Sequence, residues 1–265
     1  MDVSSLSFDV GSATHAGKVR ARNEDSCLVR TDTGLWAVAD GMGGHVAGDL
    51  ASRILVQSLD AIEQPEAALD LLEQCETQIF RANREIMGLS RAHNGATIGT
   101  TAAVLLVRDR HYACLWAGDS RVYSISCGAI KQLSRDHSEV EELVATGALS
   151  RQDAENWPNN VITRAVGVAE DLELEIVTGS AEAGDIFVIC SDGLTRHVCD
   201  DEILQHTAGR NAGAACDGML ELALQRGGVD NVTVVVVRLL AEVVHSSEPT
   251  KSPVTDGPER DGHES

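Results

Sequence analysis

The sequence predicts an α+β fold in which sheets pack together and helices cover them from outside. Stretches with the apolar pattern of β-strands come in blocks, whereas stretches with helical periodicity come in consecutive pairs. Short polar links between the strand-like stretches, such as residues 108–110, imply antiparallel neighbours rather than crossover units. With 265 residues and 43% hydrophobic content, the chain can bury the core of one large domain.

Three strands and two helices make up the first part of the expected fold. The strands span residues 6–12, 26–31 and 35–40. Each of the two helices that follow has its apolar residues on one face. These residues are Leu50, Ile54, Leu55 and Leu59 in the first helix, and Leu69, Leu72, Ile79, Ala82 and Ile86 in the second.

The second part continues with blocks of strands and helices, and no stretch repeats with a fixed period. Strand-like stretches cover residues 99–107, 111–117 and 121–126, before a polar, helical region from about 137 to 157. The remaining expected elements are strands at 160–166, 172–178 and 185–190, two helices within about 200–226, and a last strand that begins at Val232.

The charge of the chain excludes some partners and favours others. A formal net charge of −20 argues against nucleic acid and against anionic membranes, because both would be repelled at long range. Carboxylates that converge in space need protons or divalent cations between them, so the acidic surplus is also informative about ions.

The two ends of the chain and its cysteines indicate the compartment. The N-terminus has no basic segment followed by an apolar core, and no apolar run approaches the length of a membrane span, so we expect a soluble, cytoplasmic protein. Seven scattered cysteines without a Cys-x-x-Cys pair read as reduced thiols, and the histidines show no zinc-like spacing. Residues 246–265 hold three of the five prolines and no apolar cluster, so we expect a disordered acidic tail behind a domain of residues 1–245.

Acidic residues follow several of the strand-like stretches at the point where each one stops. The apolar run from Leu35 ends in Asp40-Gly41, and the run from Phe187 ends in Ser191-Asp192-Gly193. Asp119 follows a third such run, and Asp230 precedes the last one. A single Asp-Gly pair most often marks a turn after a strand, but four acids in this position favour a shared site.

Oxygen ligands without histidine or thiolate suit hard ions, which favours Mg²⁺ or Mn²⁺ at this site. Two such ions about 3.5–4 Å apart, sharing a carboxylate and a bridging water, would make a hydroxide nucleophile and neutralise the charge of a phosphoryl transition state. Glu24 and Asp25 add two acids near the start of the chain, and Arg20 could grip phosphate oxygens with two donors.

Short motifs occur in a characteristic order along roughly residues 8–238, and they resemble one known family. They are Arg20-x-x-Asn23-Glu24-Asp25, Ala39-Asp40-Gly41-Met42-Gly43-Gly44, Gly99-Thr100-Thr101, Ala117-Gly118-Asp119-Ser120-Arg121, Ser134-x-Asp136-His137-Ser138, Ile162-Thr163-Arg164-Ala165-Val166-Gly167, Ser191-Asp192-Gly193 and Asp230-Asn231-Val232-Thr233. Together they resemble the bacterial type of the PP2C (PPM) family of metal-dependent serine/threonine protein phosphatases. The resemblance implies a four-layer α/β/β/α sandwich of two packed antiparallel sheets flanked by helix pairs, with the metals in a cleft at one end.

The resemblance also implies roles for individual residues. Asp40 would bridge two Mn²⁺ or Mg²⁺ ions and Gly41 would lend a carbonyl. Asp192 and Asp230 would hold one of the ions, and Glu24 and Asp25 would act through metal-bound waters. Asp119 with Asp192 would hold a third, weaker ion, as in bacterial members. Arg20 would bind the phosphate, so that Arg20 and Asp40 are the residues implied in catalysis, and the helical region near 137–157 would form a flap beside the cleft.

One position departs from the family pattern. Eukaryotic members often carry a histidine directly after the Asp-Gly pair, proposed as the proton donor to the leaving alcohol, and here that position is Met42. The general acid therefore stays unassigned, with His45 and a water on the third ion as the two candidates.

Three other interpretations compete with the metal site. Cys190 begins a Cys-x-x-Gly-x-x-Arg pattern typical of cysteine phosphatases, but the residue before it is Ile189 instead of histidine, and Asp192 would repel a phosphate dianion. Residues 11–18 resemble a P-loop but have the wrong glycine spacing and Val19 in place of the hydroxyl. A non-enzymatic phosphatase-like module would be marked by loss of the metal ligands, which are all present.

The sequence thus predicts an enzyme that hydrolyses phosphoserine and phosphothreonine on proteins. We expect it to act in bacterial signalling on phosphorylated proteins, in opposition to a cognate Ser/Thr kinase, as a monomer and without nucleic acid or membrane partners.

Overall fold

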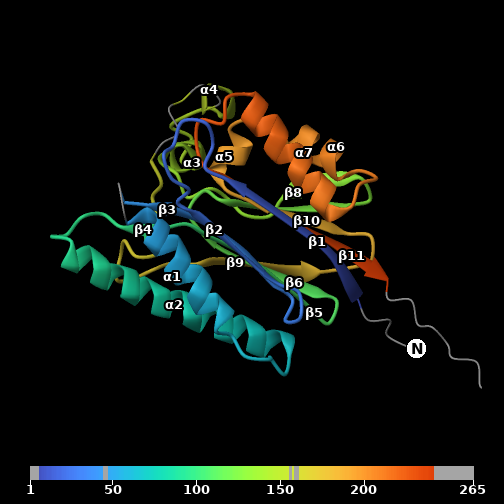
Figure 1. Cartoon of the computed structure of the whole chain (residues 1–265), viewed down its shortest axis with the longest axis horizontal. Helices are drawn as coiled ribbons and strands as arrows, with labels where there is room; N and C mark the ends of the chain where they lie inside the picture. The colour runs from blue at the N-terminus through green and yellow to red at the C-terminus, as the bar shows by residue number, and fades with distance from the viewer. Residues whose placement is uncertain (1–5, 44–46, 155–156, 158–160, 242–265) are drawn as a thin grey trace, which may run out of the picture.

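The computed structural model describes residues 6–43, 47–154, 157 and 161–241. Within them two antiparallel sheets pack face to face, and helices cover the outer face of each, which gives the four layers seen in Figure 1. The α+β class and the two-sheet sandwich are therefore confirmed. The expected tail of residues 246–265 lies outside the described residues.

The first sheet joins the two ends of the described chain. Its strand order is β1 (Leu6–His15), β11 (Val232–Ala241), β10 (Ile186–Cys190), β7 (Arg121–Ser126) and β8 (Ala129–Gln132). Helices α6 (Asp200–Thr207) and α7 (Ala212–Gln225) lie on its outer side. The short helix α5 (Asp192–Thr195) follows β10 directly.

The second sheet is built from the segments between these strands. Its order is β2 (Asp25–Arg30), β3 (Leu35–Met42), β5 (Ala102–Arg108), β6 (His111–Ala117) and β9 (Glu175–Ser180), and β4 (Gly99–Thr100) pairs with the end of β3. Helices α1 (Gly48–Asp60) and α2 (Ala68–Ala92) cover its outer face. Helices α3 (Glu139–Ala145) and α4 (Arg151–Ala154) belong to the region expected to be helical.

The central strands are continuous apolar runs because each is buried on both faces. In β3, Leu35, Ala37 and Ala39 pack under α1 and α2, whereas Trp36 and Val38 face the other sheet. Residues Val232 to Leu239 of β11 alternate in the same way between the helices and the opposite sheet. Most side chains of such a strand are therefore apolar until the strand leaves the core, and Thr233 is a buried polar exception in β11.

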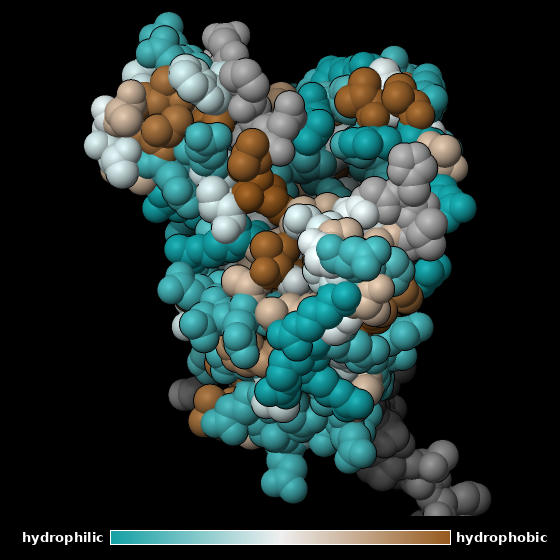
Figure 2. Space-filling model, turned by 90° about the vertical axis from the view of Figure 1, so that its left-hand side faces the viewer, coloured by the Kyte–Doolittle hydropathy of each residue, from teal (hydrophilic) through white to brown (hydrophobic). Residues whose placement is uncertain are grey.

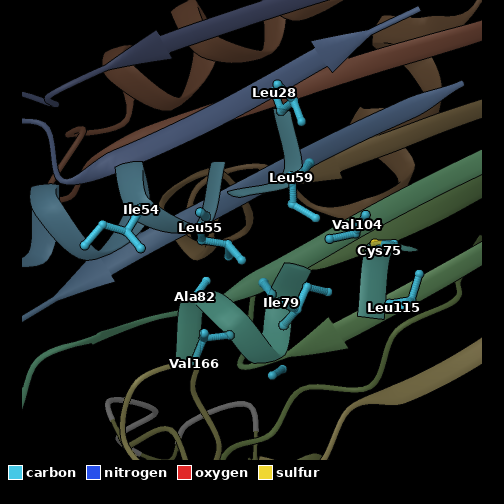
Figure 3. Packing of buried hydrophobic residues seen from close by; sticks show 14 of the residues in the cluster. Leu28, Ile54, Leu55, Leu59, Cys75, Ile79, Ala82, Val104, Leu115 and Val166 are labelled. Carbon is cyan, nitrogen blue, oxygen red and sulfur yellow. The ribbon is translucent and has the colours of Figure 1, made fainter. Parts of the chain in front are cut away.

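Packing of α1 and α2 onto the sheet follows their helical periodicity. Figure 3 shows residues of both helices directed toward the strands, where they meet the side chains of Val104 and Leu115. The buried positions of α2 are Leu71, Cys75, Ile79, Ala82, Asn83 and Ile86. Leu69 was expected on this face but is 64% exposed, because at about 100° per residue it lies on the side opposite Leu71.

Three details of the sequence prediction need correction. No strand forms in the described part of 160–166, where Ile162 and Val166 make single bridges to Ser138 and Thr100. Because the two bridges reach different elements, no ladder can develop. Strand β8 and helix α5 were not anticipated, and both are only four residues long.

Among the helices in the described residues, none is both long and apolar enough to cross a membrane.

Candidate active site

Six of the acidic residues singled out in the sequence gather at one end of the sandwich. The alternation of β3 directs Asp40 to the same face as Trp36 and Val38, so its carboxylate emerges between the two sheets. Asp192 follows β10 and Asp230 precedes β11, so both come from the other sheet. A cleft of about 420 Å³ opens between them. Figure 2 looks onto this end of the molecule, where the surface is hollowed.

The cleft brings together residues that are far apart in the chain. Its walls include Arg20, Glu24, Asp40, Gly41, Met42, Gly43, Thr101, Asp119, Ile162, Asp192, Arg196, Asp230 and Asn231. Of the predicted site residues, only Asp25 is not part of the cleft wall. It pairs with Asp40 in the register of β2 and β3 and lies just beneath it.

Asp40 is fixed by its backbone, which leaves its carboxylate for the cleft. Its N–H donates to Thr101 Oγ1 at 2.9 Å, and its carbonyl accepts from the N–H of Thr101 at 2.8 Å. The carbonyl also accepts from Thr100 Oγ1 at 3.0 Å. Burial raises the pKa of Asp40 well above its usual range, and the charges of Asp25 and Asp192 raise it further.

Asp25 is held from the other sheet. Ser191 Oγ donates to Asp25 Oδ2 at 2.8 Å, and the same hydroxyl accepts from the N–H of Thr233 at 3.0 Å. The residue is 8% exposed, and its second oxygen, Oδ1, is buried with no hydrogen-bond partner. Burial raises the pKa of Asp25 to about 7, although the hydrogen bond from Ser191 lowers it.

Asp192 and Asp230 each face an arginine. Arg20 donates to Asp230 with two parallel hydrogen bonds, Nε to Oδ1 at 2.8 Å and Nη2 to Oδ2 at 2.9 Å. Arg196 donates to Asp192 Oδ2 from Nε at 3.0 Å and from Nη2 at 2.5 Å. Oδ1 of Asp192 is buried without a partner. Burial raises the pKa of Asp192, while the positive charge of Arg196 lowers it.

Asp119 and Glu24 complete the acidic wall. Burial raises the pKa of Asp119 to about 7, and the negative charge of Asp192 contributes to the rise. Burial also raises the pKa of Glu24, with a contribution from Asp49. Neighbouring carboxylates thus add to the effect of burial on the pKa of Asp119 and of Glu24, and cations among them would relieve the repulsion.

Asn231 ties the Arg20–Glu24 loop to the start of β11. Its Oδ1 accepts from the N–H of Glu24 at 2.8 Å, and its Nδ2 donates to the carbonyls of Ala16 and Arg22 at 3.0 and 2.8 Å. The loop that carries Arg20 is thereby placed directly beside Asp230. This positioning role was not anticipated, although Asn231 belongs to one of the motifs.

Gly41 has a structural reason to be glycine. A Cβ there would lie 2.0 Å from the carbonyl oxygen of Gly48 and 2.6 Å from that of Glu24. The missing side chain thus lets β3 pack against the start of α1. The carbonyl of Gly41 as a ligand stays a prediction.

The donor set fits a hard divalent ion in its chemistry. All the acidic groups are oxygen donors, and Asp25 and Asp192 each keep a buried oxygen without a partner, which a cation would satisfy. In the described conformation, however, no three acidic, histidine or cysteine side chains in the visible parts of the chain converge as the ligands of one ion. Asp230 turns both oxygens to Arg20, so binding there requires Arg20 to turn away, whereas Asp192 turns only Oδ2 to Arg196.

Arg196 is the functional candidate that sequence reasoning missed. It was noticed only as the last residue of the cysteine-phosphatase pattern, yet its guanidinium lies in the cleft. The signal was its position four residues after Asp192, at which oppositely charged side chains on a helix meet. Met42 lines the cleft as expected from its place beside Gly41, whereas His45 lies outside the described residues.

The chain matches known proteins over most of its length. The family profile described as Protein phosphatase 2C matches residues 13–210. The serine/threonine phosphatase stp of Listeria monocytogenes is 35% identical over 238 residues, which cover 84% of this chain and 93% of that protein. The serine/threonine protein phosphatase PstP of Mycobacterium tuberculosis is 33% identical over 91% of this chain, but the match spans only 46% of PstP, about half of its length.

The fold has equally similar relatives among solved structures. The catalytic domain of PstP in complex with two manganese ions superposes with a TM-score of 0.81 at 32% identity, covering 89% of this chain and all of that one. Fold and comparisons together define the class of the protein as a protein phosphatase 2C-type domain. The chain belongs to the protein phosphatase 2C family.

Proposed function

We propose that this protein is a metal-dependent phosphatase that hydrolyses phosphoserine and phosphothreonine on proteins. The observation that carries the proposal is the convergence of Asp40 from one sheet with Asp192 and Asp230 from the other in a single cleft beside Arg20. Relatives named serine/threonine phosphatases support the substrate class.

The ions would be Mn²⁺ or Mg²⁺, with Asp40 shared between two of them. Gly41 would contribute its carbonyl, Asp192 and Asp230 would hold one ion, and Glu24 and Asp25 would act through water. The unpartnered Oδ1 atoms of Asp192 and Asp25 support this assignment. Bound there, the ions would lower the pKa of a shared water so that it can attack phosphorus, and would offset the charge of the phosphoryl group.

Arg20 would orient the substrate. Its Nε and Nη2 donate to the two oxygens of Asp230, which is the same forked geometry that two phosphate oxygens present. With 55% of its side chain exposed, the guanidinium has room to turn from Asp230 toward a phosphate at the mouth of the cleft. The proton donor to the leaving alcohol stays open between His45 and a water near Asp119.

In the cell the protein would act on phosphorylated proteins and oppose a Ser/Thr kinase in bacterial signalling. Ile162 would touch the substrate from the flap side, because it lines the cleft and is bridged to Ser138 just before α3. The flap would thereby lie within reach of the peptide around the phosphate.

Metal removal tests the proposal. The chelated and dialysed protein should not hydrolyse p-nitrophenyl phosphate or a phosphothreonine peptide, and activity should return with Mn²⁺ or Mg²⁺ and resist okadaic-acid-type inhibitors. Full turnover after exhaustive chelation would contradict the metal mechanism. Metal binding without any turnover on phosphopeptides would instead favour a non-enzymatic module.

A further inference from the structure

Arg196 lies among the carboxylates of the cleft and faces several of them at once. It follows the short helix α5, and its side chain returns to Asp192. Its Nη1 is 3.7 Å from Asp230 Oδ2, and its charge also interacts with that of Asp119. The side chain is 35% exposed, so the guanidinium lies at the outer edge of the cluster.

The two oxygens of Asp192 are used differently. Oδ2 accepts both hydrogen bonds from Arg196, whereas Oδ1 is buried and has no partner. The inner oxygen is thus left for a cation shared with Asp40, but the outer oxygen is already neutralised. A divalent ion placed between Asp192 and Asp119 would lie close to Arg196, whose charge interacts with both carboxylates, and would be repelled by it.

We propose that the guanidinium of Arg196 takes the place of a third metal cation in the carboxylate cluster. By binding the outer oxygen of Asp192, it limits the cleft to two divalent ions. Without Arg196, Asp119 and Asp192 would hold a third ion. The inference rests on the proposed metal-dependent function, and it makes Arg196 a positioning residue because it acts through Asp192.

Two simpler roles for Arg196 lead to different results. If Arg196 only formed an ordinary ion pair with a residue four positions away on a helix, its removal would change neither the number nor the affinity of bound ions. If Arg196 were instead a second phosphate-binding residue, its removal would raise KM for phosphopeptides and leave metal binding unchanged. Counting the ions therefore separates the proposal from both.

The experiment measures Mn²⁺ binding to the full chain after chelation and dialysis. Isothermal titration calorimetry gives the affinities, and equilibrium dialysis with elemental analysis gives the number of ions. The variants are Arg196→Met, which removes the charge at similar length, and Arg196→Lys, which keeps it. Arg226→Met is the control, because Arg226 pairs with Glu202 and donates to the carbonyl of His197 but does not line the cleft.

The wild type, Arg196→Lys and Arg226→Met should bind two ions, and Arg196→Met should bind three. In the range of Mn²⁺ concentrations that fills the third site of Arg196→Met, the wild type should stay at two ions, so any third-ion binding to it is at least about tenfold weaker, because it keeps a positive charge within a few ångströms. Adding Asp119→Asn to Arg196→Met should restore two ions.

Equal ion numbers and affinities in the wild type and Arg196→Met would overturn the inference, and so would three ions in the wild type. A wild type that binds no Mn²⁺ would defeat the proposed function itself. Thermal unfolding followed by circular dichroism checks that each variant folds. If Arg196→Met does not fold, Arg196→Gln replaces it, and the same result is expected.

Discussion

Two arginine–aspartate pairs in this molecule, Arg121–Asp136 and Arg196–Asp192, differ in how many carboxylate oxygens the arginine binds. Arg121 grips Asp136 with Nε to Oδ1 at 2.9 Å and Nη2 to Oδ2 at 2.7 Å, and Gln132 adds a third donor at 3.0 Å. Both oxygens of Asp136 are satisfied, and its side chain is 4% exposed. Arg196 satisfies one oxygen of Asp192 and leaves the other buried without a partner.

The difference shows how a structural pair is told from a functional one. The buried carboxylate of Asp136, with all its hydrogen bonds made, has little left to offer a ligand, and its network holds the fold together. Asp230 also has both oxygens bound, but its partner Arg20 is half exposed and free to turn away. A buried oxygen without a partner is costly and persists where a ligand satisfies it. Asp136 and Asp192 both belong to motifs of the family, but we therefore expect only Asp192 to take part in the chemistry.

Breaking the closed pair, Arg121–Asp136, in which both carboxylate oxygens are bound, should have the largest effect on stability. Arg121→Met leaves the Asp136 carboxylate buried without its cation, which should cost about 3–5 kcal/mol of unfolding free energy. Urea unfolding followed by circular dichroism measures the loss. Arg226→Met, in an exposed pair, should leave the midpoint nearly unchanged. Equal stabilities for the two variants would remove the distinction drawn between closed and open pairs.

Substituting the aspartate of the open pair, Arg196–Asp192, in which one carboxylate oxygen has no partner, should greatly reduce catalysis and spare the fold. Asp192→Asn removes ligand charge and should lower kcat by at least about a hundredfold, which corresponds to about 2.7 kcal/mol. Steady-state assays at saturating Mn²⁺ measure it, with Asp60→Asn as a control because Asp60 is an exposed surface acid. A kcat within a few-fold of the wild type would exclude Asp192 from the metal site.

Arg20 tests whether its forked pair with Asp230, in which both carboxylate oxygens are bound, serves the substrate or the metal. Arg20→Ala should lower kcat/KM at least about tenfold, with KM affected at least as much as kcat, because a phosphate grip is lost. Affinity for Mn²⁺ should be kept. If instead Mn²⁺ affinity changed while KM stayed the same, Arg20 would act through Asp230, its partner in the structure.

The sequence was most informative where its periodicity reflects burial on both sides of a strand. The runs that end at Asp40 and Asp192 could be recognised because the sandwich and its helices enclose every residue before them. The ends of those runs predicted the acidic cleft, since strands leave the core where the sheets end. The segment 160–166 failed because its apolar residues pair with two different elements.

Side-chain pairing within the cleft was beyond the sequence. Neither the forked contact of Arg20 with Asp230, over 210 positions, nor the placement of Asn231 under Glu24 follows from local patterns. They depend on loops brought together by the pairing of β1 with β11. The Arg196–Asp192 contact is local, by contrast, and could have been anticipated from its spacing.

Cys190 lies at the boundary between the closed and the open pair, and it yields the smallest expected effect. In the register of β7 and β10 it is opposite Arg121, and Asp192 follows two residues later. Strand β10 ends at Cys190, so the alternation does not continue to Asp192. The cysteine side chain packs in the core under α5 to α7, and burial raises its pKa to about 12.

A thiolate nucleophile is therefore not expected, and Cys190→Ser should leave kcat unchanged. Its cost should be limited to about 1–3 kcal/mol of stability, from burying a hydroxyl in place of a thiol. Cys216→Ser is the matched control, because Cys216 is buried in the same core. Iodoacetamide should not inactivate the folded wild type by alkylating Cys190, so phosphate should give no protection against iodoacetamide. If Cys190→Ser folded like Cys216→Ser yet lost turnover, the nucleophile would be the cysteine, and Asp192 would need another role.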